Sequence, residues 1–187
     1  MTVQFQSADK AVSVPAELQA RKPTRIRLAP SMRGADMVSV IARDNIADLR
    51  HNLQVFMISG SAASVHKSRV SARRLRVFLK GTRTWMLPEI HRSLAINLKL
   101  AMMILHPVRQ HDVVKDWLDG AGAETRGMGQ DRGAMVHDAR AQVAKTEMIG
   151  VVDEFAKTMQ VGRGRRRDAE VLDQPCLCIV PGIVDRS

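Results

Sequence analysis

The stretch at residues 65–80, VHKSRVSARRLRVFLK, places the strongest constraint on the fold of this chain. Apolar residues recur in it at helical spacing, no Gly or Pro interrupts it before Gly81, and Ser64 is suited to cap its N-terminus. At about 100° per residue, five of its cationic side chains fall within an arc of roughly 80°. These cations are His66, Arg69, Arg73, Arg76 and Lys80. We therefore predict an amphipathic helix that packs through one face and presents positive charge on the other.

The positive face lacks the acidic residues that usually accompany surface lysine and arginine. No Asp or Glu occurs between Ser64 and Pro88, whereas an ordinary solvated helix face places opposite charges at i,i+4 spacing. A solvated face remains one interpretation of such a stripe. The uncompensated repulsion favours the other interpretation, which is a surface that binds a polyanion.

Two motifs, in this order, resemble those of the CHAD domain family. The first is VHxxRxxxRRLR at residues 65–76, which is similar to the signature helix of that family. The second is LK at residues 98–99 followed by LHPVRQHDV at 105–113, which is similar to the family's Leu-Lys helix and the turn after it. His106 and Gln110 depart from the family pattern. The resemblance implies an all-α domain that binds inorganic polyphosphate, of which this chain shows about one half.

The resemblance also implies which residues contact the phosphates, and Lys80 joins them from the same arc. The expected polyphosphate-binding residues are His66, Arg69, Arg73, Arg74, Arg76, Lys80, Lys99 and Arg109. Guanidinium groups suit this task because each planar fork offers paired donors to two phosphate oxygens. Polyphosphate carries a charge on every repeat, so a stripe along a helix can follow it without reading any sequence.

Composition agrees with a basic helical protein. Of 187 residues, 45% are hydrophobic but only 3% are aromatic, so the core must consist of Leu, Ile, Val, Ala and Met, which suits a helical bundle. The formal net charge of +10 points to an acidic partner, which could be nucleic acid, an anionic membrane or a phosphate polymer. The shortage of aromatic residues disfavours single-stranded nucleic acid, because its bases stack on aromatic side chains.

Prolines, glycines and charge divide the chain into three parts. We expect an extended basic lead-in at 1–34, a helical domain at 35–160, and a basic and apolar tail at 161–187. The fold predicted for the middle part is a four-helix-bundle-like half of a CHAD domain with a basic groove face. Long helices are expected over 35–58, 65–85, 89–105 and 134–159, with a short helix from about Asp112 to Leu118 and a glycine-rich loop before the last long helix.

Several other functions are disfavoured by the sequence. No apolar run is long enough for a signal peptide or a membrane span, and Cys176 and Cys178 suit reduced thiols in the cytoplasm. His106, His111 and Asp112 cluster in sequence, but a tight turn rarely presents three ligands to one metal. No triphosphate-hydrolysing CYTH domain is recognisable. We therefore expect a binding module that is not an enzyme, has no cofactor or metal, and is cytoplasmic with an association with polyphosphate granules.

Two questions remain open at this level. Nonspecific nucleic-acid binding is the alternative function, because a basic helix can lie in a DNA groove, although the exposed face lacks the Asn and Gln that read bases. A single signature helix also provides only one wall of a groove. Two copies related by a twofold axis would supply the second wall, so a homodimer bridged by polyphosphate is expected.

Overall fold

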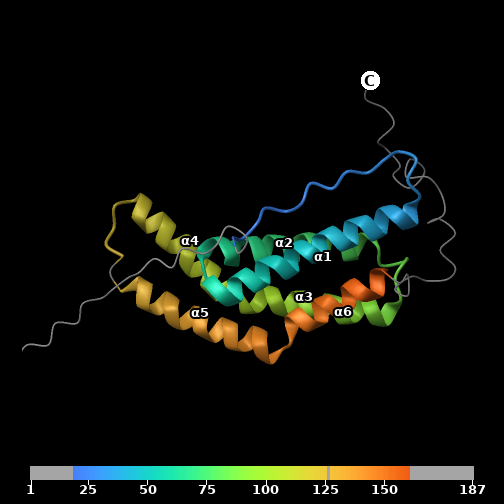
Figure 1. Ribbon diagram of the computed structural model, residues 1–187. Helices are drawn as coiled ribbons and strands as arrows, with labels where there is room; N and C mark the ends of the chain where they lie inside the picture. The colour runs from blue at the N-terminus through green and yellow to red at the C-terminus, as the bar shows by residue number, and fades with distance from the viewer. Residues whose placement is uncertain (1–18, 126, 161–187) are drawn as a thin grey trace, which may run out of the picture.

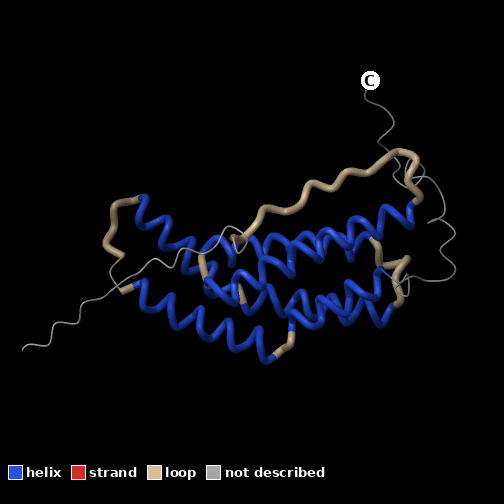
Figure 2. The backbone as a smooth tube through the Cα atoms, viewed as in Figure 1, coloured by secondary structure: helices blue, strands red, loops and turns tan. Residues whose placement is uncertain are grey.

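The computed structural model describes residues 19–125 and 127–160, which form six α-helices and no β-strand. Figures 1 and 2 show their arrangement. The helices are α1 (Gly34–Ser59), α2 (Ala62–Gly81), α3 (Pro88–Ile104), α4 (His106–Gly120), α5 (Met128–Lys145) and α6 (Met148–Gln160). The predicted all-α fold is confirmed. The predictions for the tail, including those for Cys176 and Cys178, lie outside the described residues.

Four of the helices form a bundle around a single core. Helix α1 packs against α2 and α6, and α3 packs against the same two helices from the opposite side, so that the four enclose one interior. Helices α4 and α5 pack against each other and extend from one end of the bundle, as Figure 1 shows. The bundle thus fixes α2 and α3 as neighbours, and these two helices carry most of the basic residues singled out by the sequence.

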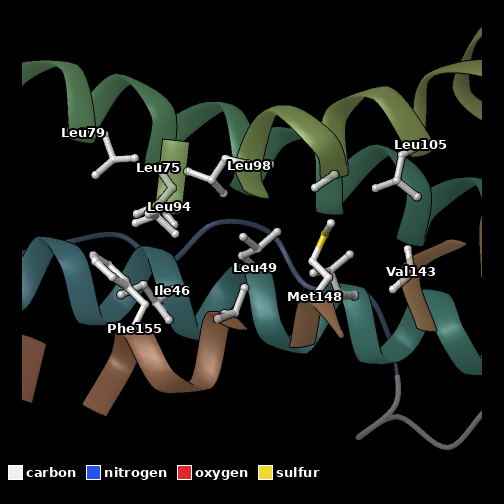
Figure 3. Close-up of a cluster of buried hydrophobic side chains, with 14 of the residues drawn as sticks. Ile46, Leu49, Leu75, Leu79, Leu94, Leu98, Leu105, Val143, Met148 and Phe155 are labelled. Atoms are coloured by element: carbon white, nitrogen blue, oxygen red, sulfur yellow. The ribbon is translucent and has the colours of Figure 1, made fainter. Parts of the chain in front are cut away.

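The core is aliphatic, as the composition predicts. Figure 3 shows side chains from four helices meeting in its centre, among them Ile46 of α1, Leu75 of α2, Leu98 of α3 and Phe155 of α6. Each of these side chains is at most 6% exposed. Helix formation here follows from the burial of one apolar stripe per helix, because short helices are marginal in water without such packing.

Residues 19–33 run along α1 without forming a helix (Figure 2). Asp48 of α1, which is 1% exposed, accepts hydrogen bonds from the backbone N–H of Thr24 at 2.6 Å, from its hydroxyl at 2.8 Å, and from Nε of Arg21 at 3.0 Å. Asn52 accepts from the Arg21 N–H and donates to the Arg21 carbonyl. The segment is therefore anchored to the outside of the bundle by two polar side chains of α1.

Both ends of the signature helix differ from the prediction. Helix α2 begins at Ala62 and is capped by Ser61, whose hydroxyl accepts a hydrogen bond from the Ser64 N–H at 3.2 Å. Ser64 is buried in the first turn and does not cap the helix. At the other end α2 stops at Gly81, four residues before the predicted end at Trp85. An earlier serine followed by two alanines, which are strong helix formers, explains the early start.

Helix α4 begins at His106, six residues before the predicted start at Asp112. Pro107 lies in the first helical turn. An N–H at this position would have no acceptor within the helix, so its absence in proline costs no hydrogen bond, and the fixed φ of proline suits the helix. The segment 105–111, expected as a turn, is therefore mostly helical. The predicted end at Leu118 lies two residues before the end of α4 at Gly120.

The single helix predicted over 134–159 is wrong. The structure divides this region between α5 and α6, and the chain changes direction at Glu147, which has a positive φ of 48°. The glycine-rich loop predicted before residue 134 is shorter than expected, since α5 already begins at Met128 and includes Gly129 and Gly133. Tertiary contacts outweigh the low helix propensity of these glycines, because Arg132 of α5 binds both Asp112 and the carbonyl of Gly60.

Candidate functional site

A groove lies on the surface between α2 and α3, next to the short connection that joins them. Its volume is about 890 Å³. The lining residues come from the second half of α2, the connection, and one face of α3. They are Arg76, Leu79, Lys80, Arg83, Thr84, Pro88, His91, Arg92, Ala95, Ile96 and Lys99. Because residues 82–87 form a tight connection, α2 and α3 must run antiparallel, and their cations face a common space.

The groove is strongly positive. Five of its lining residues are Lys or Arg, and among the described residues that line it there is no carboxylate. None of these five cations forms an ion pair with any described residue. Glu89, the acidic residue in the first turn of α3, lies instead beside α6 in a separate apolar pocket. Positive charges that line a concave surface and that no carboxylate neutralises attract anions.

A pair of arginines continues the positive surface beyond the groove. Nη1 of Arg69 donates a hydrogen bond of 2.8 Å to the carbonyl of Met102, which lies in the last turn of α3 and has no partner within the helix. Burial and, second, the positive charge of Arg109 lower the pKa of Arg69. Arg109 belongs to the first turn of α4. The pair thus lies where α2, α3 and α4 meet, and Arg69 is held in place by its contact with α3.

The structure brings together most of the residues predicted from the sequence. Arg76, Lys80 and Lys99 line the groove, and Arg69 and Arg109 form the pair at its far end. His66 and Arg73 are exposed on the same face of α2. The opposite side of α2 is buried as predicted, with Ser68, Ala72, Leu75 and Leu79 at most 2% exposed.

Arg74 is the exception among the predicted residues. It is half-buried and does not line the groove. It lies two helical turns after Lys67, on the same flank of α2, and Lys67 donates a hydrogen bond to the carbonyl of Ala20. This flank therefore faces the anchored segment along α1. Arg74 is separated by the helix itself from the cations that face α3.

Three groove residues were not predicted, namely Arg83, His91 and Arg92. The spacing of Arg92 and Lys99, which are two helical turns apart on the predicted helix 89–105, is a signal that could have identified Arg92. Arg83 follows the end of α2, so its position depends on the turn that joins the helices. His91 lies beside Arg92 at the edge of the same face, and only the packing of α3 shows that it enters the groove.

Two further arginines are occupied by structural contacts. Arg132 donates to Asp112 at 2.6 Å and to the Gly60 carbonyl at 2.8 Å, and Arg140 donates to the carbonyls of Phe56 and Ile58. Both guanidinium groups thereby bind carbonyl groups at the C-terminal end of α1, where most carbonyls lack a partner within the helix. The carbonyl of Phe56 also accepts a hydrogen bond from the Gly60 N–H. These arginines belong to the fold and are not available to a ligand in the same way as those of the groove.

The cluster of His106, His111 and Asp112 does not form a metal site in the structure. Asp112 is 4% exposed and its carboxylate binds Arg132, whereas His106 is exposed to solvent. Across residues 19–125 and 127–160, no three His, Cys, Asp or Glu side chains lie close enough together to hold a metal ion. The helical geometry of α4 separates residues that are adjacent in the sequence.

Comparison with known proteins identifies the family. The sequence model described as CHAD domain matches residues 40–173, which is more than half of the chain and includes the whole groove. The chain belongs to the CHAD domain family. CHAD domains are polyphosphate-associated helical modules and are generally not catalytic. Neither a curated protein nor a solved structure matches this CHAD domain. None of the described helices is long and apolar enough to cross a membrane.

Proposed function

We propose that this CHAD domain binds inorganic polyphosphate through the groove between α2 and α3, as a binding module without catalytic activity. The observation that carries the proposal is the concentration of five unpaired cations in one groove that contains no carboxylate among the described residues. The contacting residues are Arg76, Lys80, Arg83, His91, Arg92 and Lys99 in the groove, with His66, Arg69, Arg73 and Arg109 beyond it. Arg74 contributes only through its charge at the flank.

The chemistry of the groove suits a flexible chain of phosphates. Its arginines offer forked pairs of donors, while Lys80 and Lys99 supply compact charges that adapt to any position of the chain. No Asn or Gln occurs among the residues that line the groove, so it offers contacts to phosphates but not the paired amide contacts by which proteins read adenine. The same residues could bind the backbone of duplex DNA, which therefore serves as the competitor in the test.

The test is a competition titration between polyphosphate and duplex DNA at matched phosphate concentration and fixed salt. We expect polyphosphate to bind at least tenfold more tightly, which corresponds to about 1.4 kcal/mol. A flexible polyanion can adapt its phosphates to the cations along a surface groove between two helices, whereas a rigid duplex presents its phosphates along a fixed curve. Equal affinities would reduce the function to nonspecific binding of polyanions by a basic protein.

We also propose that polyphosphate bridges two copies of the domain. The groove is open to solvent on the side away from the bundle, so a bound chain keeps phosphates available for a second groove, and a twofold arrangement would use the same residues on both copies. Repulsion between two positive faces opposes dimers of the free protein, and a bridging polyanion removes it. Association with polyphosphate granules in the cytoplasm follows from the same multivalent contact.

Light scattering during a polyphosphate titration measures this association. We expect a monomer or weak dimer without ligand and a doubling of the mass at low ratios of ligand to protein. Excess polyphosphate should restore the monomer, because each copy then binds its own chain. Tight binding that leaves the mass unchanged throughout, or aggregation before any ligand is added, would contradict the bridged dimer.

A further inference from the structure

The cations of the groove and the Arg69–Arg109 pair lie along one line. Helices α2 and α3 are antiparallel and remain in contact from their connection at residues 82–87 to the hydrogen bond between Arg69 and the carbonyl of Met102. Arg69 and Lys80 are 11 residues apart on α2, and Arg83 lies about one turn further along. At a rise of 1.5 Å per residue, the row from Arg69 to Arg83 is about 20 Å long.

The row has a defined composition along its length. It begins with Arg69 and Arg109 and continues past Arg73 on α2. It then enters the groove at Arg76 and Lys99 and ends at Arg83, in the connection. The groove itself contains only the second half of this row, since neither Arg69 nor Arg109 lines it. A small anion bound beside the connection at residues 82–87 therefore leaves the arginine pair unused.

The arginine pair keeps hydrogen-bond donors that the fold does not use. The contact with Met102 uses one of the five N–H donors of Arg69, and neither arginine has a carboxylate partner among the described residues. The pair brings two positive charges together in a partly buried place. Such an arrangement costs free energy in the absence of an anion, and a bound phosphate would recover that cost.

We propose that this row sets a minimum ligand length, so that the domain selects polyphosphate chains long enough to extend from Arg83, in the connection, to the Arg69–Arg109 pair. The inference rests on the proposed function of the groove. A chain that fills the groove and extends about 20 Å engages the second group of cations without a second loss of translational freedom, so its affinity rises steeply at that length. Chains longer than the row gain little more per domain.

A length series of phosphates tests the threshold by isothermal titration calorimetry at fixed salt. The probes are tripolyphosphate and size-fractionated polyphosphates whose extended lengths fall below and above about 20 Å. We expect the affinity of the parent protein to rise steeply as the length passes this value and then to level off. A smooth rise with length and no change of slope would overturn the threshold.

Arg109→Gln is the decisive variant. Arg92→Gln, which removes the same charge inside the groove, is the variant with which it is compared. The measured quantity is the ratio of the affinity for a long chain to the affinity for tripolyphosphate. Arg109→Gln should lower this ratio at least fivefold, whereas Arg92→Gln should weaken both ligands and leave the ratio within a factor of two. Arg109→Lys should restore part of the ratio, and unfolding by heat confirms that each variant is folded.

The outcomes separate this inference from the function on which it rests. If Arg109→Gln lowers both affinities by the same factor, or lowers neither, the arginine pair does not sense length and the inference fails while polyphosphate binding stands. If the parent protein binds no phosphate chain of any length, the proposed function itself fails. The exposed Arg43→Gln on α1, which removes the same charge away from the groove, should change neither affinity.

Discussion

Replacing Gly60 with alanine is expected to lower the free energy of unfolding by about 3–4 kcal/mol. Gly60 ends α1 with a φ of 59°, a conformation that costs other residues about 1–2 kcal/mol. A Cβ atom there would lie 2.6 Å from Cγ1 of Val136 and 2.9 Å from Nη2 of Arg140. Overpacking of this kind adds about 1–3 kcal/mol.

Urea unfolding followed by circular dichroism measures the effect, and Gly133→Ala is the matched control. Gly133 lies inside α5, and an added Cβ would have no neighbour within 4 Å. Alanine at this position should raise the free energy of unfolding by about 0.5–1 kcal/mol, because glycine is a poor helix former. A Gly60→Ala protein within 1 kcal/mol of the parent would show that α5 moves away from the end of α1 at little cost.

The double substitution Arg76→Gln and Lys80→Gln is expected to weaken polyphosphate binding roughly 100-fold, or about 2.7 kcal/mol. Both side chains are exposed, line the groove and belong to successive turns of α2. Hydrogen bonds to charged groups contribute about 1.5–3 kcal/mol when well formed, and exposure to solvent reduces this to the lower end. The dependence of log affinity on log salt should also become less steep, by analogy with counterion release from DNA.

Arg25→Gln with Arg27→Gln gives a control that removes the same two charges. These arginines are exposed on the segment that runs along α1, away from the groove. They should lower the affinity by no more than about threefold through the loss of long-range attraction, which salt screens. Equal losses in the two double variants would mean that net charge, and not the groove, controls binding. Titrations of both proteins at two salt concentrations distinguish these results.

The parts of the fold that depend on local periodicity could be predicted from the sequence. The spacing within residues 65–80 predicted which side chains of α2 face the core, and the buried Leu75 and exposed Arg76 agree with it. The helix expected over 89–105 likewise agrees with α3, whose buried side chains include Leu94 and Leu98. When each helix packs against a common core, its one apolar stripe is enough to predict which of its side chains are buried.

The parts that depend on contacts between distant residues could not be predicted. The break between α5 and α6 depends on the positive φ of Glu147, a residue with no sequence signal for such a conformation. Helix α5 begins within a glycine-rich stretch because Arg132 binds the end of α1, 72 residues earlier. Likewise, Arg83 and His91 join the groove only because the connection between α2 and α3 is tight, and no local pattern gives its geometry.

The position of the groove on the outside of the bundle has a kinetic consequence. Helices α2 and α3 are fixed to each other and to the core by their buried faces, while Arg76, Lys80 and Lys99 remain exposed. A ligand can enter sideways along the full length of the row, and no helix has to separate first. Association is then governed by diffusion and by attraction between opposite charges, and it slows as salt increases. For the proposed polyphosphate ligand, departure can proceed one phosphate at a time, so two domains can exchange a single chain without releasing it into solution.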